Sequence, residues 1–172
     1  EKTNMRQQLV QFVDVYPVQI HISSIACGRY VSDFGMEEGF VFDEPIIDFR
    51  VKNKELEYPI INESQIASFG WMDSQEVREM KKKAIRINDF LTGLFATANI
   101  RVVDIKLEFG RVFNGEEFMT MLVDEVSPDT CKLWDMNSNE KLCYELAKEQ
   151  PDKLLPAYQE VMKRLGIKGG AK

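Results

Sequence analysis

The clearest pattern in the chain lies in residues 100–110, where apolar and charged side chains alternate. The apolar positions are Val103, Ile105, Leu107 and Phe109, and the charged positions between them are Asp104, Lys106 and Glu108. Because successive side chains of a strand point to opposite faces, this pattern predicts a strand whose charged groups share one face. A solvated edge strand would show the same alternation.

A second apolar segment, residues 119–135, is the expected partner of this strand. Asn114-Gly115 is a strong signal for a two-residue turn, which would pair Phe113 with Glu116. That register puts Glu125, rather than Asp124, on the face of Glu108. A bulge or a wider loop at residues 110–113 would bring Asp124 there instead. Paired carboxylates beside Lys106 would suit Mg²⁺ and a triphosphate.

Two further segments near the N-terminus are strand-like. Residues 9–25 are rich in Val, Ile, Phe and Tyr, and Pro17 predicts a bulge or an edge position, since proline cannot donate to the ladder. Residues 40–52 alternate as a strand pair, with turns expected near residues 43–45 and 53–54. These segments predict a sheet built of antiparallel strands.

The longest predicted helix begins at a capping box, in which Asp73 and Glu76 satisfy the first free backbone N–H groups. It runs to about Ala98, and Asn99 is a suitable stop. Its predicted buried stripe consists of Val77, Met80, Ala84, Ile87, Leu91 and Leu94. A last helix is expected from Pro151 to Gly166. The predicted fold class is therefore α+β, an antiparallel sheet with flanking helices, in a single domain over residues 1–172.

Composition limits the kind of function. The 172 residues carry a formal net charge of −6, which argues against nonspecific nucleic-acid binding. No apolar run approaches membrane-spanning length. The three cysteines show no paired spacing, and His21 is the only histidine, so neither disulfides nor a zinc site is expected. We expect a cytoplasmic protein without nucleic-acid or membrane partners.

Residues 23–29 are a candidate anion-binding loop. Small residues such as Ser23, Ser24 and Gly28 allow backbone N–H groups to approach an anion, and Arg29 can pair with a phosphate or a carboxylate. A plain turn would have a similar composition.

The runs Val-Asp-Ile-Lys-Leu-Glu-Phe-Gly (103–110) and Val-Asp-Glu-Val-Ser-Pro-Asp-Thr-Cys-Lys-Leu-Trp-Asp (123–135) resemble signature segments of the SAICAR synthetase family. The resemblance covers nearly the whole chain, but only the later part of the family's pattern. It implies the C-terminal lobe of an ATP-grasp-like fold. The family's N-terminal ATP lobe has no counterpart here, so the resemblance leaves room for a separate ATP-lobe chain.

The resemblance also implies an activity: ATP-dependent joining of L-aspartate to carboxyaminoimidazole ribotide through an acyl phosphate, with Mg²⁺. On this basis Lys106 and Asp129 are catalytic, Glu108 and Asp124 hold the metal and nucleotide, and Val10 and Phe12 belong to the hinge that contacts adenine. The implied substrate-binding residues are Ser23, Ser24, Gly28, Arg29, Lys132 and Lys148.

The chain also departs from the family's pattern. The family usually has arginine at the Ser23 position, serine at the Arg29 position and arginine at the Lys132 position, and its later basic run is mostly replaced here. A catalytically degenerate paralogue, acting as a binding or assembly module, is therefore the alternative. An apolar face around residues 9–18 would favour a homo-oligomer.

Overall fold

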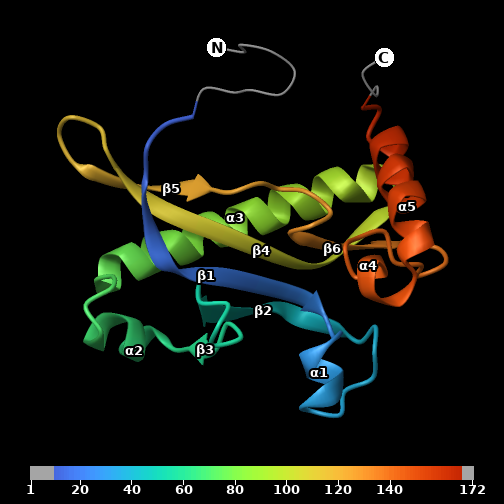
Figure 1. Cartoon of the computed structure of the whole chain (residues 1–172), viewed down its shortest axis with the longest axis horizontal. Coiled ribbons are helices and arrows are strands. Elements are labelled where there is room, and N and C mark those ends of the chain that lie inside the picture. Colours follow the sequence, from blue (N-terminus) through green and yellow to red (C-terminus); the bar gives the residue numbers. More distant parts are fainter. Residues whose placement is uncertain (1–9, 168–172) are drawn as a thin grey trace.

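The computed structural model describes residues 10–167 as a six-stranded antiparallel sheet with one long helix across a face (Figure 1). The strands are β1 (Asp14–Ile25), β2 (Val41–Val51), β3 (Ile60–Ile61), β4 (Ile100–Phe113), β5 (Phe118–Val123) and β6 (Cys131–Asp135). Their order is β3-β2-β1-β4-β5, and β6 pairs with β4. The α+β class predicted from the sequence is confirmed.

Five helices complete the described part of the chain. They are α1 (Arg29–Ser32), α2 (Glu63–Ser68), α3 (Ser74–Thr97), α4 (Leu146–Glu149) and α5 (Pro151–Arg164). Helix α3 runs along one face of the sheet, whereas α1 follows the end of β1, and α4 and α5 lie at one end of the sheet (Figure 1). No helix in residues 10–167 is long and apolar enough to cross a membrane.

The main core fills the space between the sheet and α3. Strand β1 contributes Val18, Ile20 and Ile22, and β4 contributes Ile105, Leu107 and Phe109, all at most 2% exposed. Burying each such side chain stabilises the fold by roughly 1.5–3 kcal/mol. This apolar face fixes the sheet against α3 and leaves its other face available for polar groups.

Helix α3 begins as predicted and deviates only near its end. The Asp73 side chain accepts hydrogen bonds from the Gln75 and Glu76 backbones, and the Glu76 side chain reaches back to the Asp73 backbone. The predicted stop at Asn99 has a positive φ of 57°. Leu94 was wrongly placed in the buried stripe: it is 41% exposed, and Phe95 is buried instead.

Proline 17 marks a bulge rather than an edge. The pairing of β1 with β4 shifts register between Val15 and Gln19, while β1 lies in the interior of the sheet, between β2 and β4. The predicted turn at residues 43–45 is wrong, because β2 runs continuously through them. It bulges away from β1 between Val41 and Ile46.

The predicted two-residue turn at Asn114-Gly115 is also wrong. Phe113 pairs with Phe118, so residues 114–117 form a four-residue loop, and Asn114 accepts hydrogen bonds from the Glu116 and Glu117 backbones. Two extra residues leave the strand faces unchanged. The wider loop therefore does not bring Asp124 to the side of Glu108.

Candidate active site

Three adjacent strands contribute to one polar face of the sheet, opposite α3. Strand β4 supplies the predicted row, and β1 and β2, the next two strands in the sheet, contribute further polar side chains to the same face. The side chains of this polar face are Gln19, His21 and Ser23 from β1, Asp48 and Arg50 from β2, Lys52 directly after β2, and Asp104, Lys106 and Glu108 from β4. Strand register places His21 opposite both Lys106 and Asp48.

Lys106 lies at the centre of an acidic cluster. Its Nζ is 3.3 Å from Glu108 Oε1 and 3.2 Å from Asp124 Oδ2. The two carboxylates are thus no farther apart than the sum of these distances, close enough to share one cation. The other Glu108 oxygen, Oε2, is 2.5 Å from Lys52 Nζ.

Asp124 reaches this cluster through its backbone conformation. It follows β5 directly and has a φ of 69°, in the left-handed region that aspartate tolerates better than most residues. This turn redirects its side chain toward Lys106, which strand alternation alone would not do. Among the described residues, Glu125, the alternative partner of Glu108, forms no ion pair with Lys106.

The cluster keeps its charges through mutual pairing. Partial burial works to lower the pKa of Lys106, but Asp124 and Glu108 raise it overall. Partial burial likewise works to raise the pKa of Asp124, but the Glu125 backbone N–H and the Lys106 ammonium lower it overall. These shifts keep Lys106 protonated and Asp124 ionised at neutral pH.

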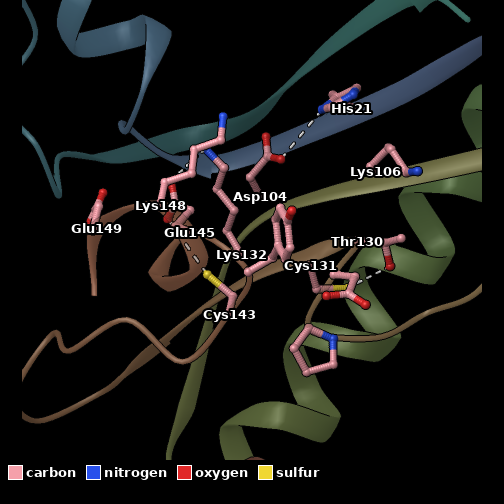
Figure 2. Close-up of a pocket in the computed structure, with 13 residues that line it drawn as sticks. His21, Asp104, Lys106, Thr130, Cys131, Lys132, Cys143, Glu145, Lys148 and Glu149 are labelled. Carbon is pink, nitrogen blue, oxygen red and sulfur yellow. Dashed lines mark hydrogen bonds and ion pairs between the residues drawn. The ribbon is translucent and has the colours of Figure 1, made fainter. Parts of the chain in front are cut away.

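A pocket of about 370 Å³ opens beside the cluster (Figure 2). Four predicted site residues line it together: Lys106, Asp129, Lys132 and Lys148. Asp129 Oδ1 accepts a hydrogen bond from the Tyr158 hydroxyl on α5. Lys132 is held by Glu145 Oε1 at 3.2 Å. The structure therefore brings together residues that are distant in the sequence.

Asp104 anchors the floor of this pocket and was not predicted as a site residue. Its Oδ2 accepts a 2.5 Å hydrogen bond from Ser23 Oγ, and its Oδ1 lies 3.6 Å from His21 Nδ1. Burial works to raise the pKa of Asp104, but His21, Lys132 and Ser23 together hold it below the ordinary value. Asp104 is thus a largely enclosed carboxylate that Ser23 and His21 hold in place.

The loop after β1 borders a second, smaller hollow of about 200 Å³. This smaller hollow is lined by His21, Asp104 and Lys132, which also line the larger pocket, and by Ser23 and Arg29, which do not. Gly28, between Cys27 and Arg29 of this lining, has a φ of 53°, and a Cβ there would come within 3.4 Å of Lys132 Nζ. Arg29 lines this hollow and also lies 3.4 Å from Asp48, so its guanidinium pairs with a carboxylate of the protein at the edge of the hollow.

Six predicted site residues line neither of these two hollows: Glu108 and Asp124, which belong to the acidic cluster, and Gly28, Val10, Phe12 and Ser24. Val10 and Phe12 are 71% and 93% exposed and line a separate apolar hollow with Val123. Ser24 lines neither of the two polar hollows, unlike its neighbour Ser23, because successive strand residues face opposite ways. Leu9, part of the predicted adenine hinge, lies outside the described residues.

The sequence did contain a signal for the missed residues. His21 lies on β1, Arg50 on β2 and Lys52 directly after β2, in the same period of two as the charged row of β4. An alternating strand buries one face and directs the other to solvent or a site. Applying the alternation rule to all three strands would have identified these polar positions before the structure.

Known proteins with related sequences and structures identify the family. The profile described as SAICAR synthetase matches residues 1–165. The phosphoribosylaminoimidazole-succinocarboxamide synthase of Rickettsia felis is 58% identical over 165 residues, covering 96% of this chain and 70% of the relative; that of Rickettsia prowazekii is also 58% identical, with the same coverage. The chain belongs to the SAICAR synthetase family.

Solved SAICAR synthetase structures share the fold described above. The crystal structure of the Ehrlichia chaffeensis synthase superposes with a TM-score of 0.91 at 36% identity, covering 97% of this chain and 70% of that one. A SAICAR synthetase in complex with ADP superposes with a TM-score of 0.87 at 30% identity, covering 95% of this chain and 68% of that one. These matches support the ligase interpretation and give no support to the degenerate paralogue.

Proposed function

We propose that this SAICAR synthetase family protein is an ATP-dependent ligase that joins L-aspartate to carboxyaminoimidazole ribotide. The observation that carries the proposal is Lys106, which lines the 370 Å³ pocket and whose Nζ lies between Glu108 and Asp124. A cation flanked by two acids suits phosphoryl transfer, in which negative charge must be neutralised where it develops. The family membership and the ADP complex of a structural relative support ATP as the nucleotide.

Magnesium fits the acidic cluster. No group of three or more His, Cys, Asp and Glu side chains in residues 10–167 is arranged to hold a metal ion alone. Mg²⁺ is ordinarily bound by one or two carboxylates together with substrate phosphates and water, as Glu108 and Asp124 would allow. When bound with nucleotide, the ion would screen the phosphate charges.

The reaction divides into two transfers. The ribotide carboxylate attacks the γ-phosphorus of ATP, forming an acyl phosphate and releasing ADP, while Lys106 neutralises charge on the transferring group. The aspartate amine then attacks the acyl carbon, loses a proton, and expels inorganic phosphate containing one former carboxylate oxygen. Asp129, Lys132 and Lys148 line the pocket in which these substrates would be held.

The apolar hollow at Val10, Phe12 and Val123 is the proposed contact for adenine. It has a volume of about 410 Å³ and apolar walls, and Val123 directly precedes Asp124. A base in this hollow would therefore leave its phosphates beside the acidic cluster. The same exposed apolar residues support self-association, or docking of a separate ATP-lobe chain.

Isotope transfer tests the proposed chemistry. Ribotide labelled with ¹⁸O in its carboxylate should pass one labelled oxygen to inorganic phosphate for each amide formed, because that oxygen becomes the bridge of the acyl phosphate. Lys106→Met should reduce turnover by about a hundredfold or more. Lys82→Met, at an exposed position on α3, is the matched control and should retain activity. Unlabelled phosphate accompanying amide formation would exclude the acyl phosphate.

A further inference from the structure

The single histidine of the sequence lines the pocket, and the two transfers described above give it no role. His21 is on β1, and its side chain is largely enclosed. Its Nδ1 lies 3.6 Å from Asp104 Oδ1, a contact drawn as a dashed line in Figure 2. Its Nε2 lies 3.1 Å from the side-chain nitrogen of Gln19. Each ring nitrogen therefore has one polar neighbour, and the two neighbours differ in kind.

These two neighbours select one tautomer of the neutral imidazole. The amide nitrogen of Gln19 can only donate, so Nε2 accepts, and the ring proton belongs on Nδ1, facing the Asp104 carboxylate. A carboxylate at one ring nitrogen and a lone pair at the other is the arrangement in which histidine acts as a general base. A substrate amine would have to replace only the Gln19 amide to reach that lone pair.

Strand register shows which way the lone pair faces. His21 pairs with Lys106, and Gln19, two residues earlier on β1, pairs with Glu108. Nδ1 is turned toward Asp104, two residues before Lys106 on β4, so Nε2 is turned toward the Glu108 end of the row. One such step of two residues is about 7 Å. The lone pair is thus on the side of the ring nearer the acidic cluster, where the acyl phosphate would form.

The other possible bases in this pocket are already engaged. Each of the four carboxylates found to line the 370 Å³ pocket has a partner. Asp129 accepts a hydrogen bond from a tyrosine hydroxyl, Asp104 accepts one from a serine hydroxyl, and Glu145 and Glu149 are paired with lysines. Carboxylates are also weaker bases than imidazole toward an ammonium group. His21 is therefore the side chain of this pocket best suited to accept a proton from an amine.

We propose that His21 is the base that takes a proton from the α-ammonium group of L-aspartate, so that the amine can attack the acyl phosphate. An N–H bond breaks and its proton bonds to Nε2, while the electron pair left on nitrogen forms the bond to the acyl carbon. The C–O bond to phosphate then breaks, and phosphate leaves with those electrons and with the second nitrogen proton. Asp104 balances the charge of the imidazolium, which returns its proton to water. The inference rests on the proposed function.

Replacing aspartate with hydroxylamine tests the role of His21. Hydroxylamine is already a neutral amine at neutral pH, so it attacks an acyl phosphate without a base and leaves a hydroxamate. His21→Asn keeps an amide that can donate to Asp104 but cannot accept the proton. It should lower aspartate-dependent amide formation about a hundredfold or more, while ATP-dependent hydroxamate formation stays at the wild-type rate. Arg86→Gln, exposed on α3, is the control and should retain both activities.

Nitrogen NMR of the wild type gives a second readout that needs no variant. Because the sequence has one histidine, the imidazole signals belong to His21 without further assignment. In the neutral ring, Nδ1 should be the protonated nitrogen and Nε2 the unprotonated one. A neutral ring with its proton on Nε2 would overturn the inference, since no lone pair would then face the amine.

The outcomes separate this inference from the proposed function. Equal loss of amide and hydroxamate in His21→Asn would show a structural role and overturn the inference, as would unchanged amide formation. A wild type that forms both products while the variant also forms both at full rate would leave the ligase activity intact and remove His21 from it. A wild type that forms neither product would contradict the proposed function, and the inference would fall with it.

Discussion

Asp124 shows how one residue's backbone can place a functional group. With a φ of 69° it occupies a region that costs most non-glycine residues about 1–2 kcal/mol, whereas aspartate, asparagine and glycine enter it more readily. Its side chain pairs with Lys106 as a result. Conformational tolerance and chemistry therefore favour the same residue at this position.

Substitutions at Asp124 should separate these two requirements. We expect Asp124→Asn and Asp124→Gly to leave the free energy of unfolding within about 0.5 kcal/mol of wild type, and Asp124→Ala to lower it by about 1–2 kcal/mol. All three should weaken Mg-ATP binding, since each removes the carboxylate. Urea unfolding and nucleotide titration measure the two effects. Equal stability of the alanine and glycine variants would contradict the conformational argument.

Asp135 is a structural carboxylate whose pairing should be visible in the pH dependence of stability. Its Oδ1 accepts hydrogen bonds of 2.8 Å from the Asn137 and Ser138 backbones, and Oδ2 lies 2.6 Å from Arg164 Nη1. The Ser138 hydrogen bond, with those of Arg164 and Asn137, lowers the pKa of Asp135 well below its ordinary range.

A depressed folded-state pKa stabilises the protein above the unfolded-state value, about 3.9 for aspartate, and that stabilisation is lost as pH falls toward the folded-state value. At pH 7 we expect Asp135→Asn to unfold more easily than wild type by about 1–3 kcal/mol, because the ion pair with Arg164 is lost. The difference should hold above about pH 5 and shrink below about pH 4. Urea melts across pH 3–7 measure it, and a difference independent of pH would argue against the charged pair.

At the scale of elements, the bulge in β1 depends on a glycine in β4. Gly110 pairs with Val15 where the register shifts. A Cβ added to Gly110 would lie 2.5 Å from Val13 Cγ1 and 2.7 Å from the Asp14 carbonyl oxygen. The two strands approach closely at this point because no side chain separates them.

Gly110→Ala should therefore destabilise the sheet. Overpacking of this kind costs about 1–3 kcal/mol. Gly93→Ala is the matched control, since Gly93 is an exposed position of α3 with no atom within 4 Å of a new Cβ; it should stabilise by about 0.5–1 kcal/mol. Thermal unfolding distinguishes the two by opposite shifts in Tm. A stable Gly110→Ala variant would show that the strands can separate without cost.

Sequence rules for helix caps and turns predicted an element correctly where residues close in the sequence determine it. The capping box at Asp73 and the helix end at Asn99 were predicted correctly because each depends on residues close in the sequence. Asp73 bonds to backbone N–H groups of the first helical turn, and Asn99 tolerates a positive φ. The turn expected at residues 43–45 failed, because β2 keeps pairing with β1 on either side of Pro45 and absorbs it as a bulge. The Asn114-Gly115 turn failed because the Asn114 side chain closes a wider loop.

Across the whole molecule, the two faces of the sheet have different roles. The α3 side holds the apolar core, and the opposite face holds the acidic cluster and both hollows. Period-two alternation predicted the β4 row correctly. The hollows themselves could not be predicted that way, because they join β6, α1 and the segment before α4 to that row. Lys132 meets Asp104 only through the pairing of β6 with β4.

The exposed apolar residues at the start of the described chain bear on assembly. Val10, Phe12 and Val15 are 71%, 93% and 43% exposed, and they adjoin the apolar hollow that includes Val123. A contiguous apolar surface of this kind favours burial against a second copy, at about 25 cal/mol per Å² of area removed from water. We therefore expect concentration-dependent self-association of the 172-residue chain.

Phe12→Asp should weaken that association at least tenfold, because a carboxylate on the contact face must lose its hydration when two copies meet. Its Tm at low concentration should match wild type, since Phe12 makes little contact within its own chain at 93% exposure. Phe90→Asp, at a 67% exposed position of α3, replaces another exposed phenylalanine outside this patch and should leave association unchanged. Sedimentation velocity over a wide range of concentrations measures the association. A wild-type chain that stays monomeric throughout, or equal loss in both variants, would assign the apolar surface to adenine alone.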